Sequence, residues 1–207
     1  MKLKQMNEIK LNGYLKNIQP SHTIGNVYYD RADLVVPRPN GKEDIVRLVF
    51  KRYSNTYNED DFISLTGNVR SYSAKDDNDR NKVSIYVFTY FDVPEERIDD
   101  DKHIDYVIDG RICKIDPIRT TSNDRMNIHF ILANNLIVSD GDRKLNAYLP
   151  CIAWGSLAKR ISNLKVSDKI TIRGRIHSRE YVHNDDNGET EIKVAHELLV
   201  TDFEINE

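Results

Sequence analysis

An internal repeat constrains the fold of this chain more than any other feature of its sequence. Three pairs of segments match in the same order along the chain: Gly13–Pro20 with Gly110–Pro117, Phe62–Ser71 with Lys169–Ser178, and Thr89–Val93 with Thr201–Ile205. The spacing within each pair grows along the chain, as it does when loops of a duplicated module differ in length. The sequence therefore predicts two copies of one module.

The residues inside each module alternate with the period of a β-strand. Ile170, Ile172 and Ile176 share one face of such a strand, and the residues between them are polar, cationic or glycine. Gly67 and Gly174 interrupt corresponding strands, which is typical of a bulge or of a tight bend at a barrel corner. The other elements predicted in the second module are strands at Tyr106–Ile115, Met126–Ala133, Leu145–Trp154 and Glu191–Phe203, and a helix at Ser156–Leu164 with Ser156 as its cap.

Each module thus has about five strands, and a five-stranded barrel with one short helix is the OB-fold. The corresponding helix is not expected in the first module, because Ser54–Asp61 is almost wholly polar and predicts a loop. We predict an all-β protein with two tandem OB-fold barrels of Greek-key topology and a single short helix in the second.

The segment between the modules predicts the domain boundary. Residues 92–105 carry seven acidic side chains against Arg97 and Lys102, and repulsion between like charges keeps such a segment extended. We predict an N-terminal OB-fold domain at 1–93, an acidic linker at 94–105 and a C-terminal OB-fold domain at 106–205. Because the linker is this acidic, the net charge of −3 does not exclude a polyanionic ligand for the rest of the chain.

Several classes of protein are not supported by the sequence. No run of 18 apolar residues occurs, so we expect no membrane span, and we expect a cytoplasmic protein. Cys113 and Cys151 are the only cysteines, and we expect both to be small buried side chains rather than zinc ligands. No catalytic motif or Gly-rich phosphate loop is present, so we expect neither an enzyme nor a cofactor or metal.

Several segments of the second half occur in an order typical of a known family: Gly110–Ile112, Asp116–Pro117, Phe130–Ala133, Tyr148–Gly155 and Gly174–Tyr181. With these segments, residues 104–203 resemble the bacterial and phage single-stranded DNA-binding proteins. The whole chain resembles a form of that family with two OB folds in tandem.

The resemblance implies that a single strand lies across a basic outer face and that its bases stack on aromatic side chains. By position, the aromatic side chains are Tyr148, Trp154 and Tyr181, while a fourth family aromatic falls near Val138 and is lost. A lone tryptophan in a barrel is more often part of the core, and for Trp154 this alternative stays open. The accompanying cations are Arg111, Arg119, Arg125, Arg173, Arg175 and Arg179.

The first half matches this pattern less well. Ile45 stands near the place of Tyr148, and Lys51 or Phe50 near that of Trp154. Tyr72, two residues after Arg70, lies near the place of Tyr181, so both are candidates for contacts with nucleic acid. The first module therefore binds weakly, binds differently, or mainly holds subunits together.

From these observations we expect a protein that coats single-stranded DNA with little sequence specificity. It would act in replication, recombination or transfer of a phage, plasmid or chromosome. Single-module relatives are commonly tetramers, which implies a homodimer with four barrels here, and replication proteins are expected as further partners. Two alternatives stay open: a protein-interaction adaptor of a replication complex, because fold does not fix function, and an RNA-binding protein, because stacking does not detect the 2′-hydroxyl.

Overall fold

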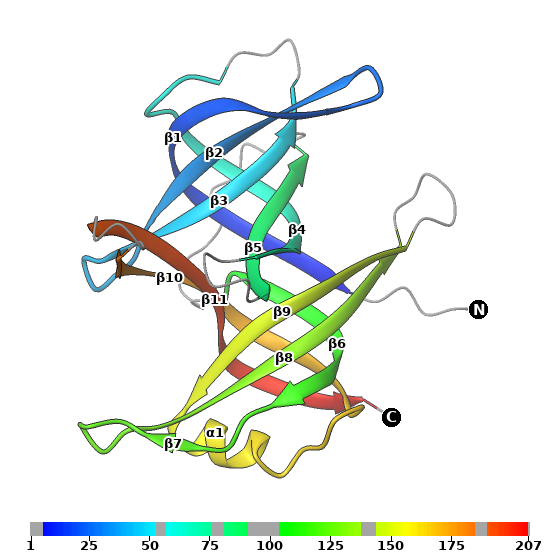
Figure 1. Ribbon diagram of the computed structural model, residues 1–207, viewed down its shortest axis with the longest axis vertical. Helices are drawn as coiled ribbons and strands as arrows, with labels where there is room; N and C mark the ends of the chain where they lie inside the picture. The colour runs from blue at the N-terminus through cyan, green and yellow to red at the C-terminus, as the bar shows by residue number, and fades with distance from the viewer. Residues whose placement is uncertain are drawn as a thin grey trace. The chain divides into compact units, whose positions relative to one another are not determined.

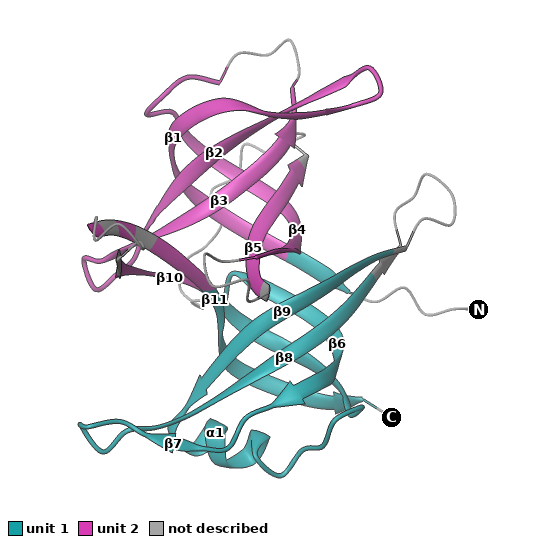
Figure 2. Cartoon of the chain, in the orientation of Figure 1, with its two compact units in different colours: residues 1–8, 102–176, 197–207 teal, residues 9–101, 177–196 magenta. Residues whose placement is uncertain are grey.

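The computed structural model describes residues 6–52, 57–75, 81–90, 104–137, 144–184 and 190–206 (Figure 1). The chain divides into two compact units (Figure 2). Unit 1 contains residues 1–8, 102–176 and 197–207, and unit 2 contains residues 9–101 and 177–196. No helix in the described part of the chain is long and apolar enough to cross a membrane.

Most of unit 2 is a barrel of five strands: β1 (Asn7–Ile24), β2 (Val27–Pro37), β3 (Glu43–Lys51), β4 (Phe62–Lys75) and β5 (Asn81–Tyr90). Strand β1 pairs antiparallel with both β2 and β4, and β2 pairs with β3. The barrel closes because β5 pairs antiparallel with β4 and parallel with β3. The predicted loop at Ser54–Asp61 is confirmed for residues 57–61, which form a turn, and residues 53–56 lie outside the described residues.

Unit 1 has the same pairing scheme. Its elements are β6 (Tyr106–Ile115), β7 (Arg119–Thr120), β8 (Met126–Ile137), β9 (Lys144–Trp154), α1 (Gly155–Ile161), β10 (Lys169–Asn184) and β11 (Thr190–Asn206). Strand β6 pairs with β8 and β10, β8 pairs with β9, and β11 pairs parallel with β9. The predicted all-β fold of two five-stranded OB-fold barrels is thereby confirmed.

The single helix lies where the sequence predicts it, but it begins earlier. Helix α1 starts at Gly155, its N-cap is Trp154, and no side chain caps it. The prediction that Ser156 is the cap is therefore wrong. Gly155 has a φ of +60°, a left-handed conformation that favours glycine, so it makes the turn from β9 into the helix.

The alternation of apolar and polar residues places the core as predicted. On β10, Ile170 and Ile172 are fully buried inside the barrel, and on β3 so are Val46 and Leu48. Residues between them face away from the core, although Thr171 is itself covered and hydrogen-bonded to Asp109.

The strand glycines have a different role from the predicted one. The ladders of Gly67 to β1 and β5 run without a register shift, so of the two predicted alternatives, a bulge or a tight bend, the bulge is wrong at this position. A Cβ atom on Gly67 would lie 2.6 Å from the carbonyl oxygen of Phe88, and one on Gly174 would lie 2.0 Å from that of Leu199. Corresponding strands therefore need glycine so that the neighbouring backbone can approach closely.

The two cysteines differ in exposure. Cys151 is buried in the barrel of unit 1, as predicted. Cys113 is exposed, so the prediction that it is buried is wrong. The reason is the alternation along β6, in which Tyr106, Ile108 and Ile112 point into the core and Cys113 falls at an outward-facing position.

Strand register also corrects the third match of the repeat. Leu48 pairs with Val87 in unit 2, and Cys151 pairs with Leu198 at the corresponding place in unit 1. This makes Thr89 the counterpart of Val200, whereas the sequence match paired Thr89 with Thr201. A shift of one residue reverses the face of every side chain in a strand, so the distinction matters.

Two short segments cluster with the unit formed by the other part of the chain. Residues 6–8 belong to unit 1, where the backbone N–H of Met6 donates to Asp109 Oδ2 (2.9 Å) and Asn7 Nδ2 donates to Asn134 Oδ1 (2.9 Å). Residues 177–196, from β10 and β11, belong to unit 2. The predicted boundaries at 93 and 106 follow chain order, so they do not assign residues 6–8 to unit 1 or residues 177–196 to unit 2. The predicted acidic linker lies outside the described residues apart from positions 104 and 105.

A buried carboxylate holds residues 177 and 178 within unit 2. Asp44 is 4% exposed, and Arg38 Nε donates to its Oδ2 at 2.7 Å. Its Oδ1 accepts the backbone N–H of Ser178 (2.9 Å) and lies 3.0 Å from His177 Nδ1. Burial alone would raise the pKa of Asp44, but these hydrogen bonds and the Arg38 charge together lower it well below its ordinary value.

Candidate nucleic-acid interface

The outer surface of strands β6, β8 and β9 in unit 1 brings several of the predicted residues together. Arg111 is opposite Ala133 in the β6–β8 ladder, and Ala133 is opposite Tyr148 in the β8–β9 ladder. These three residues form one row across the sheet. Tyr148 is 48% exposed, as expected for an outward-facing ring that can contact a ligand.

A second row crosses the same surface near the other end of β9. Arg119 on β7 is opposite Asn127, which is opposite Trp154. The guanidinium of Arg125 lies 5.4 Å from the centroid of the Trp154 ring, within the range of a cation–π contact. Because β9 rises about 3.3 Å per residue, the six residues from Tyr148 to Trp154 separate the two rows by about 20 Å.

Trp154 lies at the edge of the core. Its side chain is half-buried, and its sheet neighbours are polar or cationic. The Oδ1 atom of Asn127, beside it, is buried and has no hydrogen-bond partner within the described residues. An unsatisfied buried acceptor is costly, so the N–H of a bound base or a water would be stabilising there.

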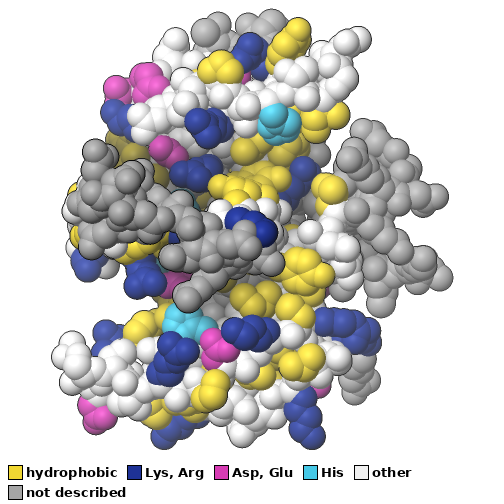
Figure 3. All heavy atoms as spheres, in the orientation of Figure 1, with side chains coloured by type: hydrophobic (Ala, Val, Ile, Leu, Met, Phe, Trp, Pro, Cys, Tyr) yellow, Lys and Arg dark blue, Asp and Glu magenta, His cyan; other side chains and the backbone are white. Residues whose placement is uncertain are grey.

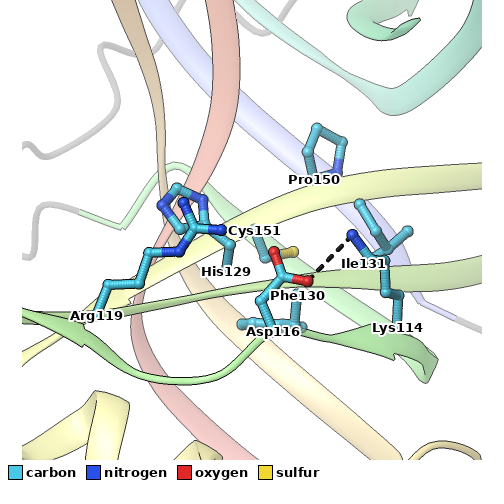
Figure 4. Close-up of a pocket in the computed structure, with 8 residues that line it drawn as sticks. All are labelled: Lys114, Asp116, Arg119, His129, Phe130, Ile131, Pro150 and Cys151. Atoms are coloured by element: carbon cyan, nitrogen blue, oxygen red, sulfur yellow. Dashed lines mark ion pairs between the residues drawn. The ribbon is translucent and has the colours of Figure 1, made fainter. Parts of the chain in front are cut away.

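A pocket of about 260 Å³ lies between the two rows (Figure 4). Lys114 and Arg119 line it from β6 and β7, His129 from β8, and Pro150 from β9. Lys114 Nζ forms an ion pair with Asp116 at 3.0 Å, marked by the dashed line in Figure 4. The pocket therefore combines cationic and apolar surface, which suits a nucleotide.

We call this outer surface of unit 1 the stacking face. Figure 3 shows that Lys and Arg side chains, a histidine and apolar side chains are interspersed over unit 1 in that view. Lys114, His129 and Pro150 were not among the predicted residues, although the alternation along Met126–Ala133 already places His129 outward. The stacking face consists of Arg111, Lys114, Arg119, Arg125, His129, Tyr148 and Trp154.

The predicted cations on β10 are placed differently. Arg173 is half-buried and forms ion pairs with Glu204 (3.0 Å) and Asp202 (3.7 Å) of β11. The acids absent from the local sequence of β10 are thus supplied by the neighbouring strand. Arg175 is half-buried on the same strand. Arg111, on β6, also has a partner within the protein, because its Nη1 donates to the carbonyl oxygen of Ser167 (3.1 Å).

Four predicted residues belong to unit 2 and are not grouped with Tyr148. Arg179 is exposed there, and Lys82 Nζ lies 4.7 Å from the ring centroid of Tyr181 and donates to its hydroxyl. Tyr72 is 44% exposed and lies 6.1 Å from Tyr86. The fourth residue is Arg70, whose guanidinium lies 3.7 Å from the ring centroid of Phe88.

Residues 105–204 match the sequence model of the single-strand binding protein family. The C-terminal half of the chain belongs to this family. The match confirms the predicted resemblance, and with it single-stranded DNA binding as the function of that half. This is a family of DNA-binding proteins rather than of enzymes.

Solved structures extend the likeness of fold to the whole chain. The wild-type single-stranded DNA binding protein from Thermus aquaticus is 17% identical, with a TM-score of 0.70 over 99% of this chain and 94% of that one. A deletion mutant of the same protein is 16% identical, with a TM-score of 0.68 over 99% of this chain and 96% of that one. At these identities the likeness shows the fold alone, and it covers both barrels. No curated protein matches the chain.

Proposed function

We propose that this protein coats single-stranded DNA by stacking bases on the two aromatic rings of the stacking face. The proposal rests on one observation: Tyr148 and Trp154 lie about 20 Å apart on one sheet surface with cations between them. Every base has a π-face, so such rings bind without strong sequence preference. Arg119 and Arg125 contact phosphates on the same surface, whereas the charge of Lys114 is offset by Asp116.

The fit is specific to a single strand. A duplex hides the faces of its bases, so rings on a flat sheet can stack only on unpaired bases. The unsatisfied Oδ1 of Asn127 beside Trp154 accepts a base N–H in this arrangement. Arg173 is given no phosphate contact, because its charge is already offset by Asp202 and Glu204.

The test is fluorescence anisotropy with labelled oligo-dT, with duplex DNA and oligo-U of the same length as competitors. We expect tight binding at low salt, weak competition by duplex, and loss of affinity as salt rises. Tighter binding of the duplex would contradict the proposal, and stronger competition by oligo-U would favour the RNA-binding alternative.

Salt titration of single variants tests the phosphate contacts. Replacement of Arg119 by alanine is expected to reduce the slope of log K against log salt by about 0.7 to 1, the value for one lost phosphate contact. Arg173→Ala is the matched control and should change the slope less, because Arg173 forms two ion pairs with acids. Equal changes in both variants would show that the stacking face is not where the phosphates lie.

The biological setting follows from this activity. A protein that protects unpaired strands serves replication, recombination or transfer of DNA, in the cytoplasm. We also propose the homodimer with four barrels, and light scattering of the free protein would show a mass twice that of one chain.

A further inference from the structure

Matching rows of the two barrels carry the same kinds of side chain in reversed order. In unit 1 the row at the end of β9 runs from cation to aromatic ring: Arg119, Asn127, Trp154. The corresponding row of unit 2 runs from ring to cation: His22, Tyr29, Lys51. The correspondence rests on strand pairing: the row of unit 1 joins β7, β8 and β9, and the row of unit 2 joins β1, β2 and β3 at the matching positions.

The first two side chains of this unit 2 row form a stack. The rings of His22 and Tyr29 lie 4.7 Å apart with an interplanar angle of 5°. His22 is exposed and Tyr29 is half-buried, with its ring centroid 6.1 Å from that of Phe88. Parallel rings supported from below and exposed above provide a surface on which a base can stack.

The other row shows the same displacement. In unit 1 it ends in an aromatic residue on the third strand: Arg111, Ala133, Tyr148. In unit 2 it begins with one on the first strand: Tyr14, Val35, Ile45. Tyr14 is 44% exposed and packs edge-on against Phe62, which is 45% exposed, with centroids 4.9 Å apart. Both rows thus move their rings from the third strand toward the first.

The hydrogen bonds within unit 2 give a reason for the displacement. The backbone N–H of Ile45, at the place that corresponds to Tyr148, donates to Ser178 Oγ at 2.8 Å. Asp44 beside it binds His177 and Ser178. His177 and Ser178 therefore lie against this end of β3, and a strand of nucleic acid would lie on β1 and β2 instead.

Cations accompany the displaced rings. Arg31 on β2 and Lys51 on β3 are exposed. Arg31 Nη2 also donates to Gln19 Oε1 at 3.1 Å, which orients its guanidinium. Of the acids near this surface, Asp60 is offset by its ion pair with Lys16, and Asp33 accepts a hydrogen bond from Asn17 Nδ2 (3.0 Å), which orients the carboxylate but leaves its charge.

We propose that unit 2 carries a second binding surface for single-stranded DNA, on the outer face of β1 and β2. This inference rests on the proposed function of unit 1 and extends it to the barrel that the family model does not match. Bases stack on the Tyr14–Phe62 pair and on the His22–Tyr29 stack, about 20 Å apart along β2. We call this surface the β1–β2 face: Tyr14, His22, Tyr29, Arg31, Lys51 and Phe62.

The test counts short oligonucleotides bound per full-length chain. An oligo-dT of about 8 nucleotides fits one OB fold, for which site sizes are about 4–16 nucleotides. The intact chain is expected to bind two, and Tyr29→Ala is expected to weaken one of the two sites by about 5- to 140-fold. Tyr28→Ala is the matched control, because Tyr28 is the adjacent tyrosine on the opposite face of β2 and its loss should leave both sites intact.

The outcomes separate this inference from the proposed function. Binding of one oligonucleotide that depends on Tyr148 and not on Tyr29 would overturn the second surface and leave unit 1 as proposed. Binding of none would overturn both. Tyr29→Phe, which keeps the ring, should retain both sites, and its unfolding curve alongside that of Tyr29→Ala separates a lost contact from a misfolded barrel.

Discussion

Replacement of Tyr148 and Trp154 together by alanine is expected to weaken oligo-dT binding by about 2–6 kcal/mol, or about 30- to 20,000-fold in Kd. Each ring contributes about 1–3 kcal/mol when a base stacks on it. The two effects should add, because about 20 Å separates the rings. No other change on the stacking face removes as much contact surface.

Anisotropy with labelled oligo-dT at fixed salt measures this loss. The control is the double variant Tyr148→Phe and Trp154→Phe, which keeps a ring at each position and should bind nearly as well as the original chain. Thermal unfolding of both variants checks that the start of helix α1, where Trp154 occupies the N-cap position, is retained. If the alanine variant bound as tightly as the phenylalanine variant, base stacking at these positions would be excluded.

Asp44→Ala is expected to destabilise unit 2 by about 3–5 kcal/mol, the usual cost of removing one partner of a buried ion pair. Its partner Arg38 is nearly as buried, with 8% of its side chain exposed, and would keep an uncompensated charge. The backbone N–H of Ser178 would also lose its acceptor. Residues 177–196 should therefore detach from unit 2 more readily.

Urea unfolding and hydrogen exchange of amides in β3 and β10 measure this effect. Because the folded-state pKa of Asp44 lies below its ordinary value of 3.8, its contribution to stability is present above about pH 4 and is lost as the pH falls further. The Asp44→Ala variant should lack this part of the acid sensitivity. Asp60→Ala, which removes an exposed pair with Lys16, is the control and should change little. Equal losses in both variants would contradict the role given to burial.

Local patterns in the sequence predicted the fold well. Alternation of buried and exposed residue types indicates a strand, so Tyr106–Ile115 was predicted with the same bounds as β6. The repeat predicted that both halves share one topology, because three segments match in the same order in each half. The aromatic residues of the stacking face were found through the resemblance, since periodicity alone does not distinguish an exposed tyrosine from a core one.

Contacts between distant segments were not predictable in this way. The acids that pair with Arg173 lie on β11, about thirty residues away, and the pattern along β10 gives no sign of them. The partners of Asp44 are likewise more than 130 residues distant, apart from Arg38. The exposure of Cys113, by contrast, follows from the alternation along β6, and the prediction failed because it rested on residue type alone.

The positions of the aromatic rings in unit 2 were likewise not predictable from the sequence alone. The resemblance placed Ile45 near the position of Tyr148 and Lys51 or Phe50 near that of Trp154. Strand register assigns Lys51 to the latter position, and Phe50 is buried in the core, so neither position carries an outward ring. Only strand pairing shows that His22 and Tyr29 lie in the same row as Lys51. The residue type at one sequence position therefore predicted the site less well than the row of paired residues across the sheet does.

Photocrosslinking tests the central account most directly. Oligo-dT with 5-iododeoxyuridine at each position in turn would be irradiated with the full-length chain, and the modified residues identified by mass spectrometry. The account predicts crosslinks at Tyr148 and Trp154 of the stacking face. Crosslinks confined to other residues of unit 1, with both rings unmodified at every position of the label, would contradict it.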